Sequence, residues 1–272
     1  MYYEPFKQLS GKIVKKSPLL RKLFYFALGV LFLRSWHFHK ALKKAGQNLP
    51  EDASVLDAGS GMGQHTWWMA RHFRHWKIKG IDIISEQIKD CDEFFRKSGM
   101  GNRVNFEEAD LVNYCEENRY DLIVSVDVIE HIENDQQVFR NFFSSLKKGG
   151  LLLLTTPSDK GGSGITPARN SSFIQEHVRN GYSLEEITDK LNFAGFKNVK
   201  TTYTYGKAGH ISWLISIKYP ALLIDISTFF TVFLPFYFTL VLPAALILNA
   251  IDVNTIHKTG TGLLVTAQKE EK

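Results

Sequence analysis

The 272-residue sequence predicts an α/β fold in which a mostly parallel sheet is covered by helices on both faces. Short, fully apolar runs alternate with helix-like stretches, as expected for strands buried on both sides. A glycine-rich turn joins the first run to the first of these helices. Acidic residues follow successive runs at their carboxyl ends, which is where such sheets bind ligands.

The individual elements follow from these patterns. After a first strand that runs into Asp57, we expect strands at 76–84, 104–108, 120–126, 151–156, 197–205 and 262–268. Helices are expected at 64–73, 85–98 and 132–148, the last of them ending before Gly149-Gly150.

The turn after the first strand places glycines at three alternate positions, Gly59, Gly61 and Gly63, two residues after Asp57. Glycine permits a positive φ and lets a ligand lie against bare backbone. The next helix presents unpaired N–H groups at its start. With a carboxylate beside them, this turn suits a ligand with a cationic amine and hydroxyls better than a pyrophosphate.

Four carboxylates fall at the carboxyl ends of the first four predicted strands. They are Asp57, Asp82, Asp110 and Asp127. Because parallel strands end at the same edge of a sheet, these four side chains are predicted to line one site.

Five motifs together resemble those of class I S-adenosylmethionine-dependent methyltransferases. They are Asp57-x-Gly59-x-Gly61-x-Gly63, Gly80-Ile81-Asp82, Ala109-Asp110-Leu111, Tyr120-Asp121-Leu122-Ile123-Val124 and Lys148-Gly149-Gly150. The resemblance covers about 50–196 and the last strand. It implies a Rossmann-like sheet of seven strands and S-adenosyl-L-methionine as cofactor.

The resemblance also implies roles for the residues of these motifs. The loop from Gly59 to Gly63 would pass beside the methionine part of the cofactor, with Asp57 near its amino group. Asp82 would accept hydrogen bonds from both ribose hydroxyls. The adenine would lie between Asp110, Leu111 and Ile83, and Asp127 would line the floor beneath the sulfonium, where negative charge is favourable.

Two other functions remain open. A nicotinamide-dependent oxidoreductase also has an acid about twenty residues after its glycines, but its Gly-x-Gly-x-x-Gly fingerprint needs glycine at Gln64, and Asp57 would face a pyrophosphate. A membrane-anchored binding or assembly protein could keep the fold without catalysis.

The stretch after the fourth strand favours the small-molecule branch of the family, which includes quinone and lipid O-methyltransferases. It reads Ser125-Val126-Asp127-Val128-Ile129-Glu130-His131-Ile132 and lacks the Asn/Asp-Pro-Pro-Tyr/Phe turn of enzymes that methylate amide or base nitrogens. His131 could be a general base or a structural helix-start residue. Glu130 is a second candidate for catalysis, or a ligand for a divalent ion.

His177 and Arg179 follow a loop rich in glycine and serine, Ser158 to Ser172, and are candidates for holding the acceptor. The alternative for Arg179 is a surface cation beside Glu185 or Glu186. No metal site is predicted, because Cys91 and Cys115 lack metal-ligand spacing. Two cysteines also indicate a reduced compartment and no disulfide framework.

An N-terminal helical arm, residues 1–48, is predicted to meet an anionic surface. Met1 to Lys44 holds ten Lys/Arg against one acid, whereas the whole chain is only +5. Between the basic clusters lies the apolar stretch Leu23 to Leu33, which is too short to span a bilayer and suits an interfacial helix. This apolar stretch argues against nucleic acid as the partner.

An apolar insert, residues 207–258, separates the last two strands of the methyltransferase domain, which comprises 49–206 and 259–272. Ile226 to Ile251 carries no charged residue. Both ends of the insert must return to one sheet, and Pro235 and Pro243 are expected to break a helix. We therefore expect a broken, re-entrant or interfacial helical insert, packed on the helix at 23–33. A water-soluble cap or a dimer interface is the alternative.

These expectations combine into one function: methyl transfer to a hydroxyl, or less readily a carbon or nitrogen, of a lipophilic small molecule. Membrane contact is expected through 23–33 and 208–255, at the cytoplasmic face of a membrane. The oligomeric state is not predicted.

Overall fold

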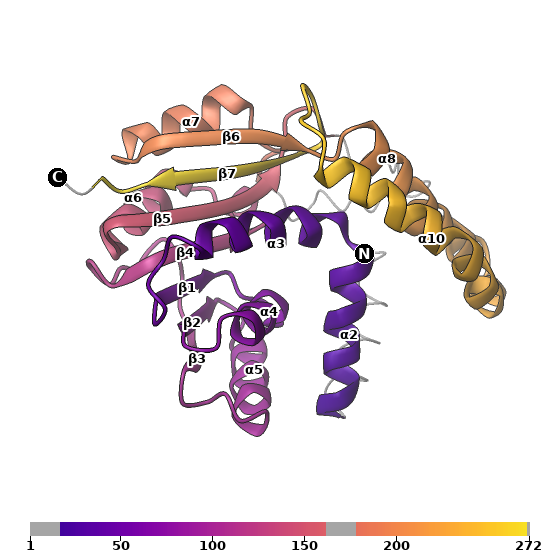
Figure 1. Cartoon of the computed structure of the whole chain (residues 1–272), viewed down its shortest axis with the longest axis horizontal. Helices are drawn as coiled ribbons and strands as arrows, with labels where there is room; N and C mark the ends of the chain where they lie inside the picture. Colours follow the sequence, from indigo (N-terminus) through magenta and orange to yellow (C-terminus); the bar gives the residue numbers. More distant parts are fainter. Residues whose placement is uncertain (1–16, 162–177, 271–272) are drawn as a thin grey trace.

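Seven strands form one mixed sheet with the order β3-β2-β1-β4-β5-β7-β6, in a computed structural model that describes residues 17–161 and 178–270 (Figure 1). Six strands run parallel and β7 is antiparallel to its neighbours β5 and β6. The strands are β1 Ser54–Ala58, β2 Lys77–Asp82, β3 Val104–Glu108, β4 Tyr120–Val126, β5 Leu146–Pro157, β6 Lys197–Thr204 and β7 Gly262–Gln268. This arrangement confirms the predicted Rossmann-like methyltransferase sheet.

Alternate residues of the central strands face opposite cores. Leu56, Ile123 and Leu154 belong to the core covered by α6 (Asp135–Ser145) and α7 (Leu184–Phe193). Val55 and Val124 belong to the other core, which is covered by α3 (Leu33–Gly46), α4 (Gln64–His72) and α5 (Ser85–Lys97). Each apolar run thus contributes side chains to the cores on both faces of the sheet, as a buried parallel sheet requires.

One predicted helix is shorter than expected. The short η1 (Ile129–His131) ends just before the span 132–148, and within this span the helix α6 covers only Asp135–Ser145 before β5 begins at Leu146. Leu146 pairs with Tyr120 of β4, so the sheet hydrogen bonds extend the strand back into a segment with helical spacing. Asn134 caps α6, since its side chain accepts from the backbone N–H of Gln137 at 3.4 Å.

Within the described part of the N-terminal arm, which begins at residue 17, α2 (Pro18–Leu31) and α3 (Leu33–Gly46) are separated by a break at Phe32. The predicted interfacial stretch 23–33 therefore belongs mainly to α2. Pro18 starts α2 at a position where a missing N–H has no cost. Along α2, Leu19, Leu23 and Phe26 are exposed.

The insert between β6 and β7 is a helical hairpin that projects from the edge of the sheet (Figure 1). Its first limb comprises α8 (Lys207–Trp213), one π-helical turn η2 (Leu214–Lys218) and α9 (Tyr219–Ile226). The second limb comprises η3 (Thr228–Phe233) and α10 (Leu234–Val253), which packs on α8. The stretch Phe229–Val253, 25 residues with a mean hydropathy of 2.1, is long and apolar enough to cross a membrane.

The expected helix breaks at the two prolines of the insert are corrected. Pro235 lies in the first turn of α10, where proline is tolerated, and Pro243 lies inside that helix without ending it. The chain instead turns at Ser227, whose side chain accepts from the N–H of Phe229 at 3.2 Å. The arm helix that α10 contacts is α3, and of the predicted stretch 23–33 its end, Leu31 to Leu33, lines a cavity shared with the insert.

Candidate functional site

The four predicted acids lie at the carboxyl edge of neighbouring strands. Asp57 is the penultimate residue of β1 and Asp82 the last residue of β2. Asp110 follows β3 by two residues and Asp127 directly follows β4. Because β3, β2, β1 and β4 are adjacent and parallel in the sheet, the structure places all four acids along one edge.

The glycine loop between β1 and α4 has the conformation that its sequence predicts. Gly59, Gly61 and Gly63 have φ values of +81°, +52° and +77°. A Cβ on Gly59 would lie 2.3 Å from the Val128 side chain, whereas a Cβ on Gly61 would meet nothing closer than 3.7 Å. Gly59 therefore allows close packing, and Gly61 leaves bare backbone beside open space.

Asp57 is a buried carboxylate, 2% exposed, that accepts a hydrogen bond of 2.5 Å from the Thr66 hydroxyl of α4. Burial raises the pKa of Asp57 to about 6, and the nearby charge of Asp82 adds to this rise. A cationic ligand group beside Asp57 would compensate the charge that burial disfavours.

Asp82 holds the glycine loop against β2. Its two carboxylate oxygens accept from the N–H groups of Gly61 at 2.9 Å and of Ile84 at 3.0 Å. Each oxygen keeps a second lone pair for an outside donor, as recognition of a diol requires. Next to it, Ile83 and Ile84 are 69% and 47% exposed, so an apolar surface adjoins the carboxylate.

Asp110 is exposed and organises its own turn, in which its carboxylate accepts from the N–H of Val112 at 2.9 Å and the side chain of Asn113 at 3.1 Å. Leu111 is buried, 5% exposed. The described contacts of Asp110 are thus those of a turn residue, and its remaining lone pairs face solvent.

Asp127 has a positive φ of 51° and lies at the centre of a small network. One carboxylate oxygen accepts from the Thr155 hydroxyl at 2.9 Å, and the other pairs with the Arg34 guanidinium at 2.6 Å. The backbone N–H of Arg34 donates to the Tyr205 hydroxyl at 2.9 Å. Arg34 of α3 and Tyr205, which follows β6, are site residues that the sequence reasoning missed.

Glu130 and His131, the two predicted catalytic residues, occupy opposite environments in η1. Glu130 is 1% exposed and accepts from the Thr156 hydroxyl at 3.2 Å, whereas His131 is exposed. Burial raises the pKa of Glu130 to about 8, and the charge of Asp127 adds to the rise. A group with a pKa near the operating pH is well matched to proton transfer, which makes Glu130 a candidate for the base.

The two predicted acceptor-binding residues differ in what the structure says of them. His177 lies outside the described residues. Arg179 forms an ion pair with Asp135 of α6 and donates to the carbonyls of Ile132 at 2.8 Å and Glu133 at 3.0 Å. These are contacts of a structural guanidinium that fastens a loop, and its observed partner is neither Glu185 nor Glu186.

Helix α2 closes over the glycine loop through Arg21, which the charge count had assigned to an anionic surface. The guanidinium is 2% exposed and donates to the Met62 carbonyl at 2.9 Å and to Asp90 at 2.8 Å. The Tyr25 hydroxyl also donates to the Met62 carbonyl. Arg21 thus faces the domain and joins the arm to the loop and to α5.

A hollow of about 480 Å³ lies between α2, α3 and α4, directly after the glycine loop. Its lining includes the stacked rings of His39, Trp68 and His72 and the cations Lys22 and Arg71. Burial lowers the pKa of His39 to about 3, so its imidazole is neutral and a poor base at physiological pH.

The hollow also contains a buried imidazole without a complete set of partners. His65 is 9% exposed, and its Nδ1 has no hydrogen-bond partner among the described residues. Burial lowers its pKa well below the usual value. At the adjoining loop, the buried hydroxyl of Ser60 likewise lacks a partner in the described part of the chain. Such orphaned polar atoms fit a site that a ligand completes.

Comparison with known proteins agrees with this geometry. Residues 33–201 match the family described as "Methyltransferase domain". The chain is 36% identical over 157 residues to phosphoethanolamine N-methyltransferase 1 of Arabidopsis thaliana, and 26% over 102 residues to ubiquinone biosynthesis O-methyltransferase of Rickettsia felis. These matches cover 56% and 38% of this chain, and 30% and 40% of the relatives.

A solved structure has the same fold. Phosphoethanolamine N-methyltransferase 2 of Haemonchus contortus, in complex with S-adenosyl-L-methionine, superposes with a TM-score of 0.62 at 18% identity over 99% of this chain and 60% of that chain. The bare backbone at Gly61, the strand-end carboxylates Asp57 and Asp82 and the exposed Ile83 fit this cofactor. The chain therefore belongs to the methyltransferase domain family and is an S-adenosylmethionine-dependent methyltransferase.

Proposed function

We propose that this enzyme methylates a hydroxyl of a lipophilic small molecule, which reaches the site from a membrane surface. The cofactor supplies an electrophilic methyl group. Asp57 would bind the ammonium group of the cofactor, and Asp82 would bind its ribose hydroxyls. Asp127 would line the floor beneath the sulfonium. Methyl transfer needs chiefly in-line placement of the two reactants, and Glu130 would take up the proton of the hydroxyl.

The observation that carries the membrane part is the inverted polarity of the hairpin. The buried residues of the hairpin are small or polar: Gly209, Ser212, Ser216, Pro220, Ala245, Asn249 and Asp252. The exposed residues are large and apolar, with Phe236 at 74% and Leu240 at 81%. Small and polar helix interfaces with an apolar exterior are typical of helices packed in lipid, whereas a water-soluble pair has the opposite pattern.

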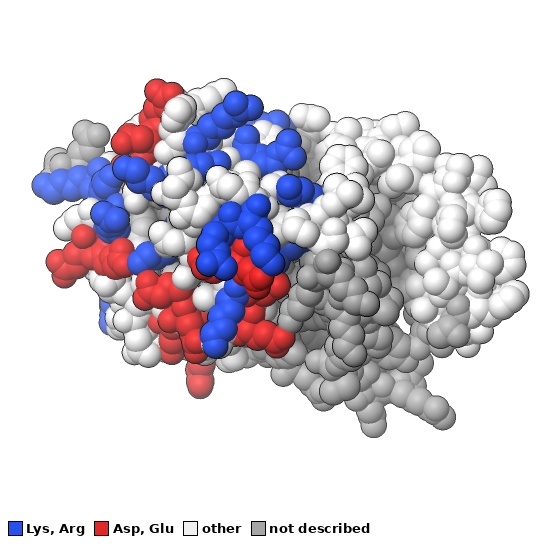
Figure 2. Space-filling model, turned by 90° about the horizontal axis from the view of Figure 1, so that it is seen from below, with Lys and Arg blue, Asp and Glu red and all other residues white. Residues whose placement is uncertain are grey.

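Several polar side chains of the hairpin bond to backbone groups within it, as a low-polarity environment favours, whereas the buried Oδ1 of Asn249 has no partner among the described residues. The Ser212 hydroxyl donates to the Ala245 carbonyl at 3.1 Å, and the Tyr237 hydroxyl donates to the Ile215 carbonyl at 2.6 Å across the two limbs. At the turn, Ser227 satisfies the first N–H groups of η3. Figure 2 shows the hairpin as a lobe almost without charge beside the charged sheet domain.

The geometry favours a hairpin that enters one leaflet tip-first and returns. The hairpin leaves the sheet after β6 and returns to it before β7, so both its ends lie at the same edge of the sheet. Exposed apolar residues of α2, including Leu23 and Phe26, would add interfacial contact. We place the enzyme on the cytoplasmic face of a membrane, because the basic arm suits anionic lipid headgroups.

The base of the hairpin connects directly to the predicted reaction site. Tyr205 lies between β6 and α8, and its hydroxyl receives the N–H of Arg34. Arg34 in turn pairs with Asp127 at the end of β4. An acceptor that leaves the bilayer along the hairpin would therefore arrive beside the proposed floor of the cofactor site.

A phosphate-bearing amine is the second candidate acceptor. The hollow between α2 and α4 combines the cations Lys22 and Arg71 with the aromatic rings of Trp67 and Trp68. Cations suit a phosphate, and aromatic faces suit an alkylated ammonium. The plant and nematode relatives that are named phosphoethanolamine N-methyltransferases support this alternative.

The membrane proposal is tested by flotation with phospholipid vesicles. Replacing Phe236 and Leu240 by aspartate should abolish binding to vesicles that contain anionic lipid, because two charges would have to enter the hydrocarbon. Phe193→Asp is the matched control, since Phe193 is 71% exposed on α7, away from the hairpin. Equal binding of the double variant and the wild type would refute membrane entry by the hairpin.

The acceptor is tested by mass spectrometry of lipid extracts from cells with the wild-type enzyme or with Asp82→Ala. Calorimetry should first show that Asp82→Ala has lost S-adenosylmethionine binding. We then expect a species that is heavier by one methyl group only in cells with the wild type. If that species appears instead among water-soluble phosphate-bearing amines, the second candidate replaces the first.

A further inference from the structure

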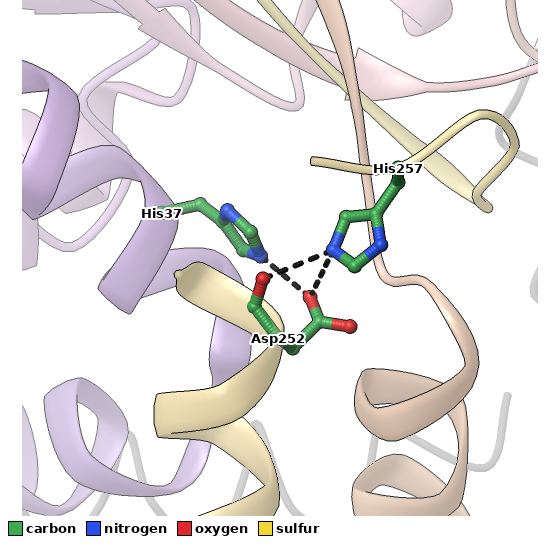
Figure 3. Close-up of side chains that lie close together, drawn as sticks. All are labelled: His37, Asp252 and His257. Carbon is green, nitrogen blue, oxygen red and sulfur yellow. Dashed lines mark hydrogen bonds and ion pairs between the residues drawn. The ribbon is translucent and has the colours of Figure 1, made fainter. Parts of the chain in front are cut away.

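A cluster of two histidines and one aspartate joins the arm, the hairpin and the sheet. His37 comes from α3, Asp252 from the last turn of α10, and His257 from the segment that leads into β7 (Figure 3). Within residues 17–161 and 178–270, this is the only group of three potential metal-ligating side chains whose ligand atoms all lie within 4.8 Å of one another. Neither the methyl-transfer site nor the hairpin proposal uses it.

The ligand atoms of the three side chains converge on one point. The Nε2 atoms of His37 and His257 lie 2.8 Å and 3.3 Å from the same Asp252 oxygen, Oδ1. Ligands of a tetrahedral zinc ion, at bond lengths of about 2.0–2.1 Å, are about 3.3 Å apart. The separation for His257 equals this value and that for His37 is shorter, so side-chain movements would accommodate an ion.

The surroundings hold the three side chains in place. Asp252 is fully buried, and its second oxygen accepts from the Gly209 N–H at 2.8 Å. A Cβ on Gly206 would lie 2.1 Å from Nδ1 of His257, so the chain passes close behind that ring. Hydrogen bonds that orient a ligand from behind are the usual support of a metal site.

We propose that His37, Asp252 and His257 bind a divalent first-row transition ion as its three protein ligands. Two imidazoles and one carboxylate are a ligand set that such ions accept. In the metal-free arrangement, the Nε2 atoms of both histidines would donate to Asp252, and Nε2 of His257 also lies 3.0 Å from the Asp252 carbonyl. Metal binding through Nε2 would require the other tautomer of each imidazole, in which the proton has moved from Nε2 to Nδ1.

The ion would act as a structural clamp at the base of the hairpin. It would join residues that are 215 positions apart in the chain, namely His37 and Asp252. His37 lies one helical turn after Arg34, which pairs with Asp127. Fastening α3 to α10 would thus hold Arg34 in place beside the methyl-transfer site.

The test uses the full-length protein without a histidine tag, with Zn²⁺ as the probe in calorimetry and Co²⁺ as a spectroscopic probe. We expect one bound Zn²⁺ per chain and the visible absorption of tetrahedral Co²⁺. Each of His37→Gln and His257→Gln should weaken Zn²⁺ binding by at least about 100-fold, the upper end of the loss seen for outer-shell partners. His75→Gln is the control, because His75 forms an exposed pair with Glu51 and should leave binding unchanged.

A second readout separates the clamp from surface binding. Zn²⁺ should raise the thermal unfolding midpoint of the wild type and a chelator should reverse this rise, with neither effect in the two glutamine variants. Binding of S-adenosylmethionine by the variants would show that they are folded. Wild-type protein that binds Zn²⁺ no more tightly than His37→Gln would overturn the proposal and leave a hydrogen-bonded cluster without metal.

Discussion

Asp57 combines a binding role with a cost in stability. Its pKa rises from 3.8 to about 6 on folding because the carboxyl is buried. Between these values the folded protein keeps a proton that the unfolded chain has lost, so the free energy of unfolding falls as the pH rises through this window. The shift corresponds to about 3 kcal/mol, which is lost fully only above pH 6.

This linkage predicts that Asp57→Asn stabilises the cofactor-free enzyme at pH 7.5 by up to about 3 kcal/mol. The gain should shrink toward zero at pH 3, which lies below both pKa values, so that Asp57 is mostly protonated in both states. The same substitution should weaken binding of S-adenosylmethionine, since the ammonium loses its counter-charge. Urea unfolding at both pH values, with and without cofactor, measures these effects, and Asp92→Asn on the exposed face of α5 is the control. A variant that is less stable than the wild type at pH 7.5 without cofactor would contradict the prediction.

Glu130 is expected to set the pH dependence of the reaction. Its pKa is raised to about 8, so it is mostly protonated at pH 7 and becomes a base as the pH increases. We expect kcat to rise with pH and level off above about 8, with an apparent pKa that belongs to Glu130 together with Asp127. Glu130→Gln should lower kcat and remove this limb of the profile.

His131→Gln provides the matched comparison, because His131 is the neighbouring residue and is exposed. We expect its pH profile to be that of the wild type. If Glu130→Gln keeps the wild-type profile and His131→Gln loses it, the assignment of the base must be reversed.

At the scale of elements, helix α2 depends on one buried guanidinium. Arg21→Ala removes the donors to Met62 and Asp90 and leaves the Asp90 carboxylate without this partner. Because Asp90 is 26% exposed, water would partly replace the guanidinium, and we expect a loss of about 2 kcal/mol rather than the full value for a buried pair.

Arg21→Ala should loosen helix α2 itself as well as lower the free energy of unfolding of the whole domain. Hydrogen exchange should become faster in α2 than in α3, and cofactor binding should weaken because the glycine loop loses its cover. Leu19→Ala is the control, since Leu19 is exposed on α2 and lies outside the buried network. Unchanged exchange in α2 would mean that the helix is held by its apolar contacts alone.

The sheet elements could be predicted because their signals are local. The strands at 104–108, 120–126 and 262–268 have the predicted bounds, since each combines a short apolar or alternating pattern with a clear stop. The acids at the strand ends follow from the same reasoning. The helix at 132–148 was predicted too long, because pairing of Leu146 with Tyr120 is a tertiary contact that sequence spacing does not contain.

The missed residues share a physical reason. Arg34 and Arg21 were counted as basic surface residues. In the structure, Arg34 pairs with Asp127 and Arg21 pairs with Asp90, and both acids lie in distant elements. His37 and His257 had no metal spacing, because the packing of α3 on α10 brings them together. Their partners lie across the fold, and a single sequence carries no local signal for such pairs.

For the molecule as a whole, the hairpin and the sheet domain are expected to be separable in function. Thr204 of β6 pairs with Gly262 of β7 directly at the base of the hairpin, so a short glycine linker can replace 208–255 without changing the register of the sheet. We expect this shortened enzyme to bind S-adenosylmethionine with nearly wild-type affinity, because Asp57, Asp82 and the glycine loop lie at strands β1 and β2.

The same shortened enzyme should no longer float with vesicles, because the exposed apolar surface of α9 and α10 is gone. Its methyl transfer to an acceptor embedded in those vesicles should fall by at least about tenfold, the factor that corresponds to 1.4 kcal/mol of lost encounter or placement. Calorimetry of S-adenosylmethionine binding on the same preparation shows whether the shortened enzyme is folded. Wild-type rates with the embedded acceptor would mean that the hairpin does not deliver the substrate, even if it binds lipid.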